Sequence, residues 1–222
     1  MKRDISAVIF DLDGVIVHTD IYHYNAWKRL ADRLGIPFSQ EINHRLRGVS
    51  RMESLDIVLS GADRRFSDGE KQAMAHEKNE TYKTFLRSMK PGDVPAVVTD
   101  TLERLRRGGF RLAIGSSSRN AGLILRNTGT ARFFDAVSDG NNISNSKPDP
   151  EVFLKAAEFL GEKPENCVIV EDAEAGIEAG RRAGMKTVSI GEAVQVGLAD
   201  FHAADFADIA DILENKMAGC FE

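Results

Sequence analysis

The sequence predicts an α/β fold in which a parallel sheet forms the core and a helical cap domain is inserted after the first strand. Two observations carry this prediction. Beyond residue 91, short apolar runs alternate with amphipathic helical segments, an order typical of a parallel sheet covered on both faces. Between about residues 20 and 89, helical patterns follow one another with no strand-like run of any length.

The composition is that of an ordinary globular protein. The 222 residues are 42% hydrophobic and 28% charged, enough for one large or two small domains with a sizeable core. A net charge of -5 argues against nucleic acid or an acidic membrane as a standing partner, although an anionic small substrate needs only local positive charge. Cys167 and Cys220 form no disulfide framework, and no long apolar region follows Met1. We therefore expect a cytoplasmic protein with no membrane span.

The first strand, Ile5–Phe10, ends in a pair of acids. The apolar run leads directly into Asp11 and Asp13, and Gly14 follows at once. Carboxylates at positions i and i+2 of an extended chain point the same way, and carboxylates avoid apolar surroundings unless they are paired or bind a metal. The end of this strand is therefore the first candidate for a functional site.

The residues behind this strand form the helical insert. Apolar side chains recur at helical spacing, Gly35 ends the first helix, and Ser67 with Glu70 gives the last helix a capped start. The predicted helices are Asp20–Leu34, a segment around Ile42–Leu46, Arg51–Leu59 and Asp68–Met89.

A break at Pro91-Gly92 is followed by the alternating half of the chain. Glycines or serines follow most of its apolar runs. Predicted helices are Thr99–Arg107, Asn120–Thr128, one with Asp149 as N-cap and Pro150 at N1 that ends at Gly161, and about Ala173–Ala183; predicted strands are Phe110–Ile114, Phe133–Val137, Cys167–Val170 and Thr187–Ile190.

Residues 1–16 and 92–222 are therefore predicted to form a Rossmann-like α/β catalytic core, and residues 17–91 a helical cap domain. In open parallel sheets, ligands bind at the carboxyl ends of the strands. Because the insert begins only a few residues after Asp13, it is placed to act as a lid over that end of the sheet.

Polar side chains also follow the later strands, and a parallel sheet brings these strand ends to one edge. Four carboxylates gathered there would repel one another unless a cation lay among them, and an all-oxygen ligand set favours Mg²⁺. A lysine and serines beside the metal would suit a phosphate group, and a carboxylate nucleophile makes an aspartyl-phosphate possible. The residues are Asp11, Asp13, Ser116, Ser117, Ser118, Lys147, Glu171 and Asp172.

Four motifs, taken in order, resemble those of the haloacid dehalogenase-like phosphotransferase superfamily over essentially the whole chain. Any one alone would be weak, but the set is specific. The motifs are Asp11-Leu12-Asp13-Gly14-Val15, the serine-ended strand Phe110–Ile114, Lys147-Pro148-Asp149-Pro150 and Glu171-Asp172-Ala173-Glu174-Ala175-Gly176.

This resemblance implies a role for each core residue. Asp11 would be the nucleophile that takes up a phosphoryl group, and Asp13 the general acid/base. Ser116 and Lys147 would hold the transferring phosphoryl oxygens. The Mg²⁺ ligands would be the Asp11 carboxylate, the Asp13 backbone carbonyl, Glu171 and Asp172.

The insert resembles the cap of the β-phosphoglucomutase subfamily. In that subfamily the position of Arg51 grips the substrate's second phosphate, the positions of His23 and Lys78 support the acid/base, and Thr19 lies at the hinge. By this resemblance the segment Ser118, Arg119 and Asn120 would help to bind the second phosphate, and Ser117 would also lie at the phosphate or substrate. The quoted cap residues are His23, Ala26-Trp27-Lys28, Leu46-Arg47-Gly48-Val49-Ser50-Arg51, Ser54-Leu55, Lys78-Asn79 and Tyr82.

Plain structural readings compete with these roles. The acids after Val170 could simply favour a helix N-terminus, and cap arginines and lysines are usually solvated. Trp27 lies on an apolar stripe, which favours core packing over ligand contact. Several positions also depart from the subfamily's common pattern, namely His18, Ser117, Arg119 and a longer loop over residues 90–97.

The resulting hypothesis is a Mg²⁺-dependent β-phosphoglucomutase that interconverts β-glucose 1-phosphate and glucose 6-phosphate through the 1,6-bisphosphate and phospho-Asp11. The alternatives are a sugar-phosphate phosphatase of the same superfamily and a non-catalytic phosphate-binding module; the intact pair Asp11 and Asp13 argues against the last. We expect a small sugar phosphate as the partner, no nucleic acid or membrane, and a monomer.

Overall fold

The structure is a computed structural model that describes residues 5–46 and 49–216. Arg47 and Gly48 of the quoted cap motif, and Cys220, lie outside the described residues. Within the described part, no helix is both long and apolar enough to span a membrane.

A six-stranded sheet, parallel throughout, forms the centre of the core, in the order β3-β2-β1-β4-β5-β6. The strand β1 lies between β2 and β4, so that Phe10 is level with both Ile114 and Val170. The residues that follow these three, Asp11, Gly115 and Glu171, therefore lie at the same edge of the sheet. The strands are β1 (Ala7–Phe10), β2 (Arg111–Gly115), β3 (Ala136–Ser138), β4 (Cys167–Glu171), β5 (Lys186–Ser189) and β6 (Phe201–His202).

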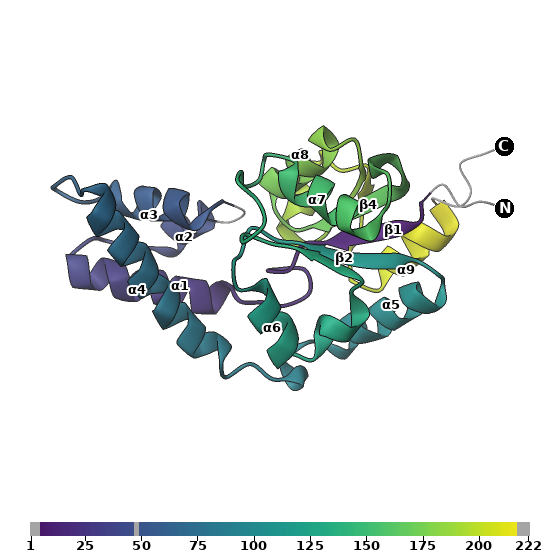
Figure 1. Cartoon of the computed structure of the whole chain (residues 1–222), viewed down its shortest axis with the longest axis horizontal. Helices are drawn as coiled ribbons and strands as arrows, with labels where there is room; N and C mark the ends of the chain where they lie inside the picture. Colours follow the sequence, from purple (N-terminus) through teal and green to yellow (C-terminus); the bar gives the residue numbers. More distant parts are fainter. Residues whose placement is uncertain (1–4, 47–48, 217–222) are drawn as a thin grey trace.

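Helices cover both faces of this sheet, as the alternating pattern predicts (Figure 1). Val8 and Phe10 pack with α5, α6 and α9, whereas Ala7 and Ile9 pack with α7 and α8. Alternate strand residues point to opposite faces, so two separate apolar clusters result. The helices here are α5 (Ala96–Arg107), α6 (Ala121–Asn127), α7 (Glu151–Leu160), α8 (Glu174–Arg182) and α9 (Asp208–Asp211), with 3₁₀ turns at Pro91–Asp93, Thr130–Phe133, Pro164–Asn166 and Gly191–Val196 and a π-helical turn at Ile212–Lys216.

Four helices between β1 and β2 form a second lobe beside the sheet (Figure 1). They have an apolar cluster of their own, which includes Trp27, Leu55 and Met74. Serine caps with reciprocal glutamates begin α3 and α4, as predicted for Ser67. The predicted domain limits at residues 16 and 91 stay predictions. The helices are α1 (Asp20–Leu34), α2 (Gln40–His44), α3 (Arg51–Leu59) and α4 (Asp68–Leu86).

Two local predictions are wrong. The run Phe133–Val137 is not one strand: Phe133 ends a 3₁₀ turn and packs into the core, and β3 begins only at Ala136. An apolar run does not distinguish a buried turn from a strand. The cap of α7 is also displaced by one residue, because Pro150 is its N-cap; the Asp149 side chain still accepts a 2.9 Å hydrogen bond from Glu151 N.

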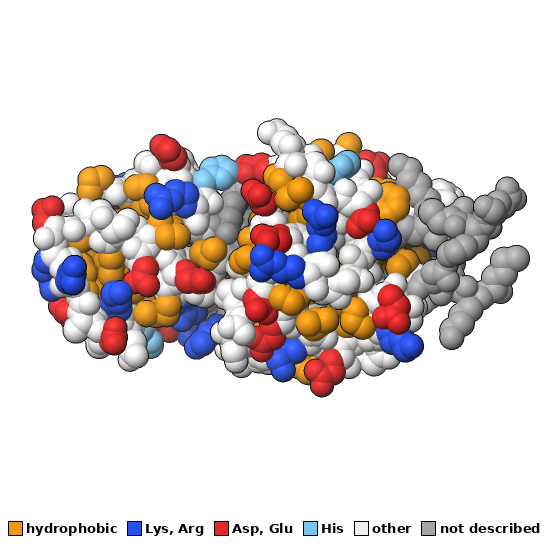
Figure 2. Space-filling view, turned by 90° about the horizontal axis from the view of Figure 1, so that it is seen from above, with side chains coloured by type: hydrophobic (Ala, Val, Ile, Leu, Met, Phe, Trp, Pro, Cys, Tyr) orange, Lys and Arg blue, Asp and Glu red, His pale blue; other side chains and the backbone are white. Residues whose placement is uncertain are grey.

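The surface carries charges of both signs. In the view from above, lysine and arginine side chains alternate with aspartate and glutamate over both lobes, and the hydrophobic side chains are scattered between them (Figure 2).

Candidate active site

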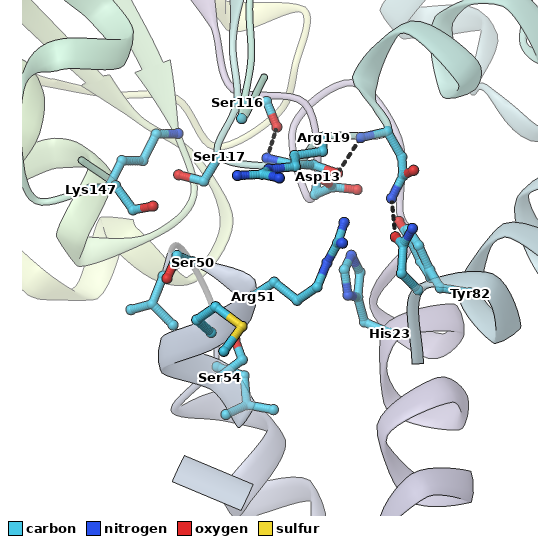
Figure 3. A pocket seen from close by; sticks show the side chains of 18 of the residues that line it. Asp13, His23, Ser50, Arg51, Ser54, Tyr82, Ser116, Ser117, Arg119 and Lys147 are labelled. Carbon is cyan, nitrogen blue, oxygen red and sulfur yellow. Dashed lines mark hydrogen bonds between the residues drawn. The ribbon is translucent and has the colours of Figure 1, made fainter. Parts of the chain in front are cut away.

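A cavity of about 550 Å³ is lined by residues of both lobes at the carboxyl end of the sheet (Figure 3). All the predicted site residues line it except Thr19, which lies directly behind Asp13. The core contributes Asp11, Asp13, Ser116, Ser117, Ser118, Arg119, Asn120, Lys147, Glu171 and Asp172, and the cap lobe contributes His23, Trp27, Arg51 and Lys78.

Lys147 is the centre of a buried charge cluster. Its Nζ lies 2.5 Å from Asp11 Oδ1 and 2.8 Å from Glu171 Oε1, and it also lies over the Phe153 ring. Burial raises the pKa of Asp11 to about 8; Lys147 opposes the rise, and Glu171 and Asp13 add to it. Burial by itself would lower the pKa of Lys147, but the two carboxylates outweigh it and raise that pKa. The lysine therefore stays charged beside the nucleophile position.

Three carboxylates converge where a cation is expected. Ligand oxygens of Asp11, Glu171 and Asp172 all lie within 4.8 Å of one another. Two glycines leave the space that these acids fill: a Cβ on Gly14 would lie 2.1 Å from Asp172 Oδ2, and one on Gly176 would lie 1.7 Å from Glu171 Oε1. An all-oxygen set of this kind fits Mg²⁺.

Asp13 has different neighbours from Asp11. The Thr19 hydroxyl donates a hydrogen bond to its Oδ1, and Lys147 acts on it only at longer range. Burial raises the pKa of Asp13, and the hydrogen bond from Thr19 opposes the rise. The resulting pKa is about 6. A carboxyl group with a pKa near neutrality can both release and take up a proton, as a general acid/base must.

The loop after β2 is organised by its own side chains. Ser116 Oγ accepts a 3.1 Å hydrogen bond from Ser118 N, and Ser118 Oγ accepts a 3.2 Å bond from Asn120 N. Each hydroxyl keeps its hydrogen for another acceptor, such as a phosphate oxygen. The Asn120 side chain donates from Nδ2 to Asn79 Oδ1 at 2.9 Å, and this bond joins the core to α4.

The cap lobe brings two nitrogen bases together. Lys78 Nζ lies 2.9 Å from His23 Nδ1 and 4.5 Å from the centre of the Trp27 ring. Burial lowers the pKa of Lys78 to about 7, and Arg51 adds to the fall. Burial, Lys78 and Arg51 hold the pKa of His23 well below its usual range. Trp27 is 2% exposed and belongs to the cap's apolar cluster, so core packing is confirmed, although the residue also lines the cavity.

Arg51 extends from the first turn of α3 toward the core loop (Figure 3). Burial lowers the pKa of its guanidinium, and the nearby charge of Arg119 lowers it further. Two cationic side chains, one from each lobe, thus lie close together at the end of the cavity formed by the cap. Such a pair gains stability from an anion placed between them.

Asn79 and Tyr82 also line the cavity, and the core motifs do not identify them. Tyr82 is 1% exposed, and its hydroxyl has no hydrogen-bond partner among the described residues. With Ala75 and Lys78 they share one face of α4 at the spacing i, i+3, i+4 and i+7. The resemblance of the insert to the β-phosphoglucomutase cap includes both residues, although the sequence assigns neither a role.

Residues 5–184 match the family of haloacid dehalogenase-like hydrolases. The chain is 40% identical over 207 residues to a β-phosphoglucomutase of Bacillus subtilis, with 92% of each protein covered. The chain therefore belongs to the haloacid dehalogenase-like hydrolase family, and it is an enzyme of that family. The sequence resemblance to this family is confirmed.

Two further relatives show the range of activities around this chain. A crystal structure of a β-phosphoglucomutase from Clostridium difficile superposes with a TM-score of 0.87 at 37% identity, covering 92% of this chain and 93% of that one. A phosphorylated carbohydrates phosphatase of Thermotoga maritima is 31% identical, with 83% of this chain and 84% of that protein covered. Mutases and phosphatases are thus both similar to this protein.

Proposed function

We propose that the protein is a Mg²⁺-dependent β-phosphoglucomutase that converts β-glucose 1-phosphate to glucose 6-phosphate through β-glucose 1,6-bisphosphate. The observation that carries the proposal is the placement of cations at two positions in one cavity. Lys147 lies against Asp11 in the core, and Arg51 and Arg119 lie close together at the junction of cap and core. A bisphosphate needs two such positions, whereas a monophosphate needs one.

In the first step, the bisphosphate has one phosphate group in the core, beside Lys147. A carboxylate oxygen of Asp11 attacks the phosphorus atom of that group. An Asp11 O–P bond forms, the bond between phosphorus and the sugar oxygen breaks, and Asp13 gives its proton to that oxygen. Lys147 and the hydroxyl of Ser116 are placed to hold the phosphoryl oxygens, whose charge spreads in the transition state.

In the second step, the hydroxyl of a sugar monophosphate attacks phospho-Asp11, and Asp13 takes up the proton of that hydroxyl. Asp13 thus releases a proton in the first step and takes one up in the second, and it stays deprotonated while Asp11 carries the phosphoryl group. Their environments separate these tasks, because Thr19 holds Asp13 whereas Lys147 holds Asp11.

Asp11, Glu171, Asp172 and the backbone carbonyl of Asp13 would hold the Mg²⁺ ion. When bound, the ion neutralises part of the charge of the carboxylates and of the transferring phosphoryl group. A cation among these acids also lowers the pKa of Asp11, which favours its ionised form.

The opposite end of the substrate would lie against the cap. Arg51, Arg119 and the Ser118 to Asn120 segment would bind the phosphate that is not transferred, with bidentate guanidinium contacts as the main source of affinity. Lys78 and His23 would lie beside the sugar and adjust the charge near Asp13. The small-molecule partner, the monomeric state, the absence of nucleic acid and the cytoplasmic location form part of this proposal.

A phosphatase acting on a sugar phosphate is the alternative, because a relative at 31% identity is named a phosphorylated carbohydrates phosphatase. Both reactions would pass through phospho-Asp11 and differ in whether water or a sugar hydroxyl intercepts it. The two cationic positions in one cavity favour the mutase, because a monophosphate substrate needs only one of them.

The test is a coupled assay for glucose 6-phosphate formed from β-glucose 1-phosphate, with catalytic bisphosphate and Mg²⁺ present and phosphate release measured in parallel. We expect glucose 6-phosphate to form much faster than inorganic phosphate. Arg51→Gln should lower the mutase rate by roughly 10–100-fold, because it removes a charged contact to the second phosphate. Arg29→Gln, an exposed change on α1, should leave the rate unchanged. If only inorganic phosphate appears, the protein is a phosphatase.

A further inference from the structure

A second cavity, also of about 550 Å³, lies between α4 and α6. Two hydrogen bonds between the helices bracket it, from Asn120 Nδ2 to Asn79 Oδ1 and from Asn127 Nδ2 to the Leu86 carbonyl, both 2.9 Å long. The same separation of 41 residues relates both pairs, so the two segments run side by side (Figure 1). The cavity therefore spans the junction of cap and core.

Four cationic residues line this second cavity, in a chain whose net charge is -5. The cap contributes two of them, one in the last turns of α4 and one at its C-cap, and the core contributes the other two. The single lining carboxylate, Asp139, already accepts hydrogen bonds from Asn141 N and Nδ2, at 2.9 and 3.1 Å. The four are Lys83, Arg87, Arg119 and Arg126.

Most of this positive charge has no counter-charge from the protein. Lys83 forms an ion pair with Glu80 at 2.8 Å. Arg87 interacts with the same carboxylate only electrostatically, at longer range. Within the described ranges, no carboxylate forms an ion pair with Arg87, Arg119 or Arg126. Like charges that face one cavity repel, and no carboxylate of the described residues pairs with these three arginines to offset that repulsion.

We propose that this cavity is a second anion site, which binds a small molecule carrying two or more phosphate charges. Planar guanidinium groups from both lobes can make paired hydrogen bonds to phosphate oxygens, and the bound anion would replace repulsion by attraction. A single phosphate would meet fewer of the four cations, so the site favours a diphosphate over inorganic phosphate.

Arg119 couples this site to the catalytic cavity, because the residue lines both. An anion in the second site competes for that guanidinium and also repels an anion bound beside Arg51. The two sites therefore oppose each other, and the coupling is reciprocal. The inference does not depend on which reaction the enzyme performs, since it concerns binding alone.

The experiment is isothermal titration calorimetry of the full chain with inorganic pyrophosphate, in magnesium-free buffer because pyrophosphate chelates the ion. We expect two binding steps. The double variant Arg87→Gln, Arg126→Gln should keep the step at the catalytic cavity and weaken the other at least tenfold. Arg51→Gln should weaken the step at the catalytic cavity and keep the step at the second site. Arg181→Gln, on the far helix α8, should change neither step.

The outcomes are distinct. A single step in the wild type that Arg51→Gln removes, or two steps that the double variant leaves unchanged, would overturn the second site. Each variant leaves one of the two sites intact. If the wild type binds at each site with the same affinity as the variant that retains only that site, the coupling through Arg119 is wrong. Because the titration measures binding and no turnover, a negative result is separate from a negative result in the mutase assay. Circular dichroism confirms that each variant is folded.

Discussion

Lys147 Nζ lies 2.5 Å from Asp11 Oδ1, and both side chains are buried, at 2% and 6% exposure. The sequence separates the two residues by 136 positions, and the parallel sheet brings them together. A buried ion pair contributes little net stability, because desolvation offsets the attraction. The pair is better explained by chemistry, because Lys147 opposes the rise that burial causes in the pKa of Asp11 and so favours the ionised nucleophile.

Asp11→Asn should abolish formation of the phosphoenzyme and lower turnover by at least roughly 10³-fold, because an amide is not a nucleophile toward phosphorus. The measurement is intact-protein mass spectrometry after exposure to the bisphosphate, with phosphate release followed in parallel. Glu174→Gln, an exposed change at the start of α8, is the control and should behave as the wild type. Retained turnover in Asp11→Asn would remove this residue as the nucleophile.

Lys147→Met should destabilise the magnesium-free protein by about 3–5 kcal/mol, because it leaves Asp11 and Glu171 buried without their cationic partner. Added Mg²⁺ should restore part of the loss, since the ion neutralises the same carboxylates. Urea unfolding with and without MgCl₂ measures both effects. In Lys186→Met, which breaks only the exposed pair with Asp200, the loss should stay below about 1 kcal/mol. Equal losses in the two variants would contradict the argument.

Gly176→Ala should weaken Mg²⁺ binding by roughly 10–100-fold, the usual effect of displacing a group that orients metal ligands. The new methyl group would lie 1.7 Å from Glu171 Oε1, which Lys147 already holds at 2.8 Å. The Mg²⁺ concentration for half-maximal activity measures the effect. Gly69→Ala is the matched control, because that helical glycine has nothing within 4 Å of a Cβ. An unchanged Mg²⁺ requirement in Gly176→Ala would exclude Glu171 from the metal site.

Much of the fold follows from patterns within short segments. Helical periodicity predicts α1 and α3 to the residue, since Gly35 and the Ser50 cap fix their ends locally. The short strand β6 was not predicted, because two residues carry no periodicity. The turn that ends at Phe133 was not predicted either, because the burial of this residue depends on its packing in the assembled core.

The core of the site is predictable for a topological reason: parallel strands must deliver Asp11, Ser116 and Glu171 to one edge. The contacts across the lobes are not. The bond between Asn79 and Asn120 and the approach of Lys78 to His23 depend on how α4 packs against α1 and α6. No spacing within one segment encodes that packing, so these partners require the structure.

Lys78 gives the protein a specific dependence of stability on pH. Its folded-state pKa is about 7, because burial and Arg51 disfavour the charged form, against 10.5 for the free side chain. Below pH 7 the lysine is charged in both states, and the cost of burying that charge is fully present. Between pH 7 and 10.5 the unfolded chain holds a proton that the folded one has released, so raising the pH favours folding. Above 10.5 the cost has disappeared.

This contribution should rise by at most about 1.4 kcal/mol per pH unit, and by a few kcal/mol over the whole window. Lys78→Met removes it, so the stability difference between the variant and the wild type should be largest near pH 6 and shrink toward pH 10. Urea unfolding at pH 6, 8 and 10 measures that difference. Lys155→Met on α7, away from both cavities, is the control variant. A constant difference for Lys78→Met would show that Lys78 stays charged in the fold, because only a depressed pKa makes its burial cost depend on pH.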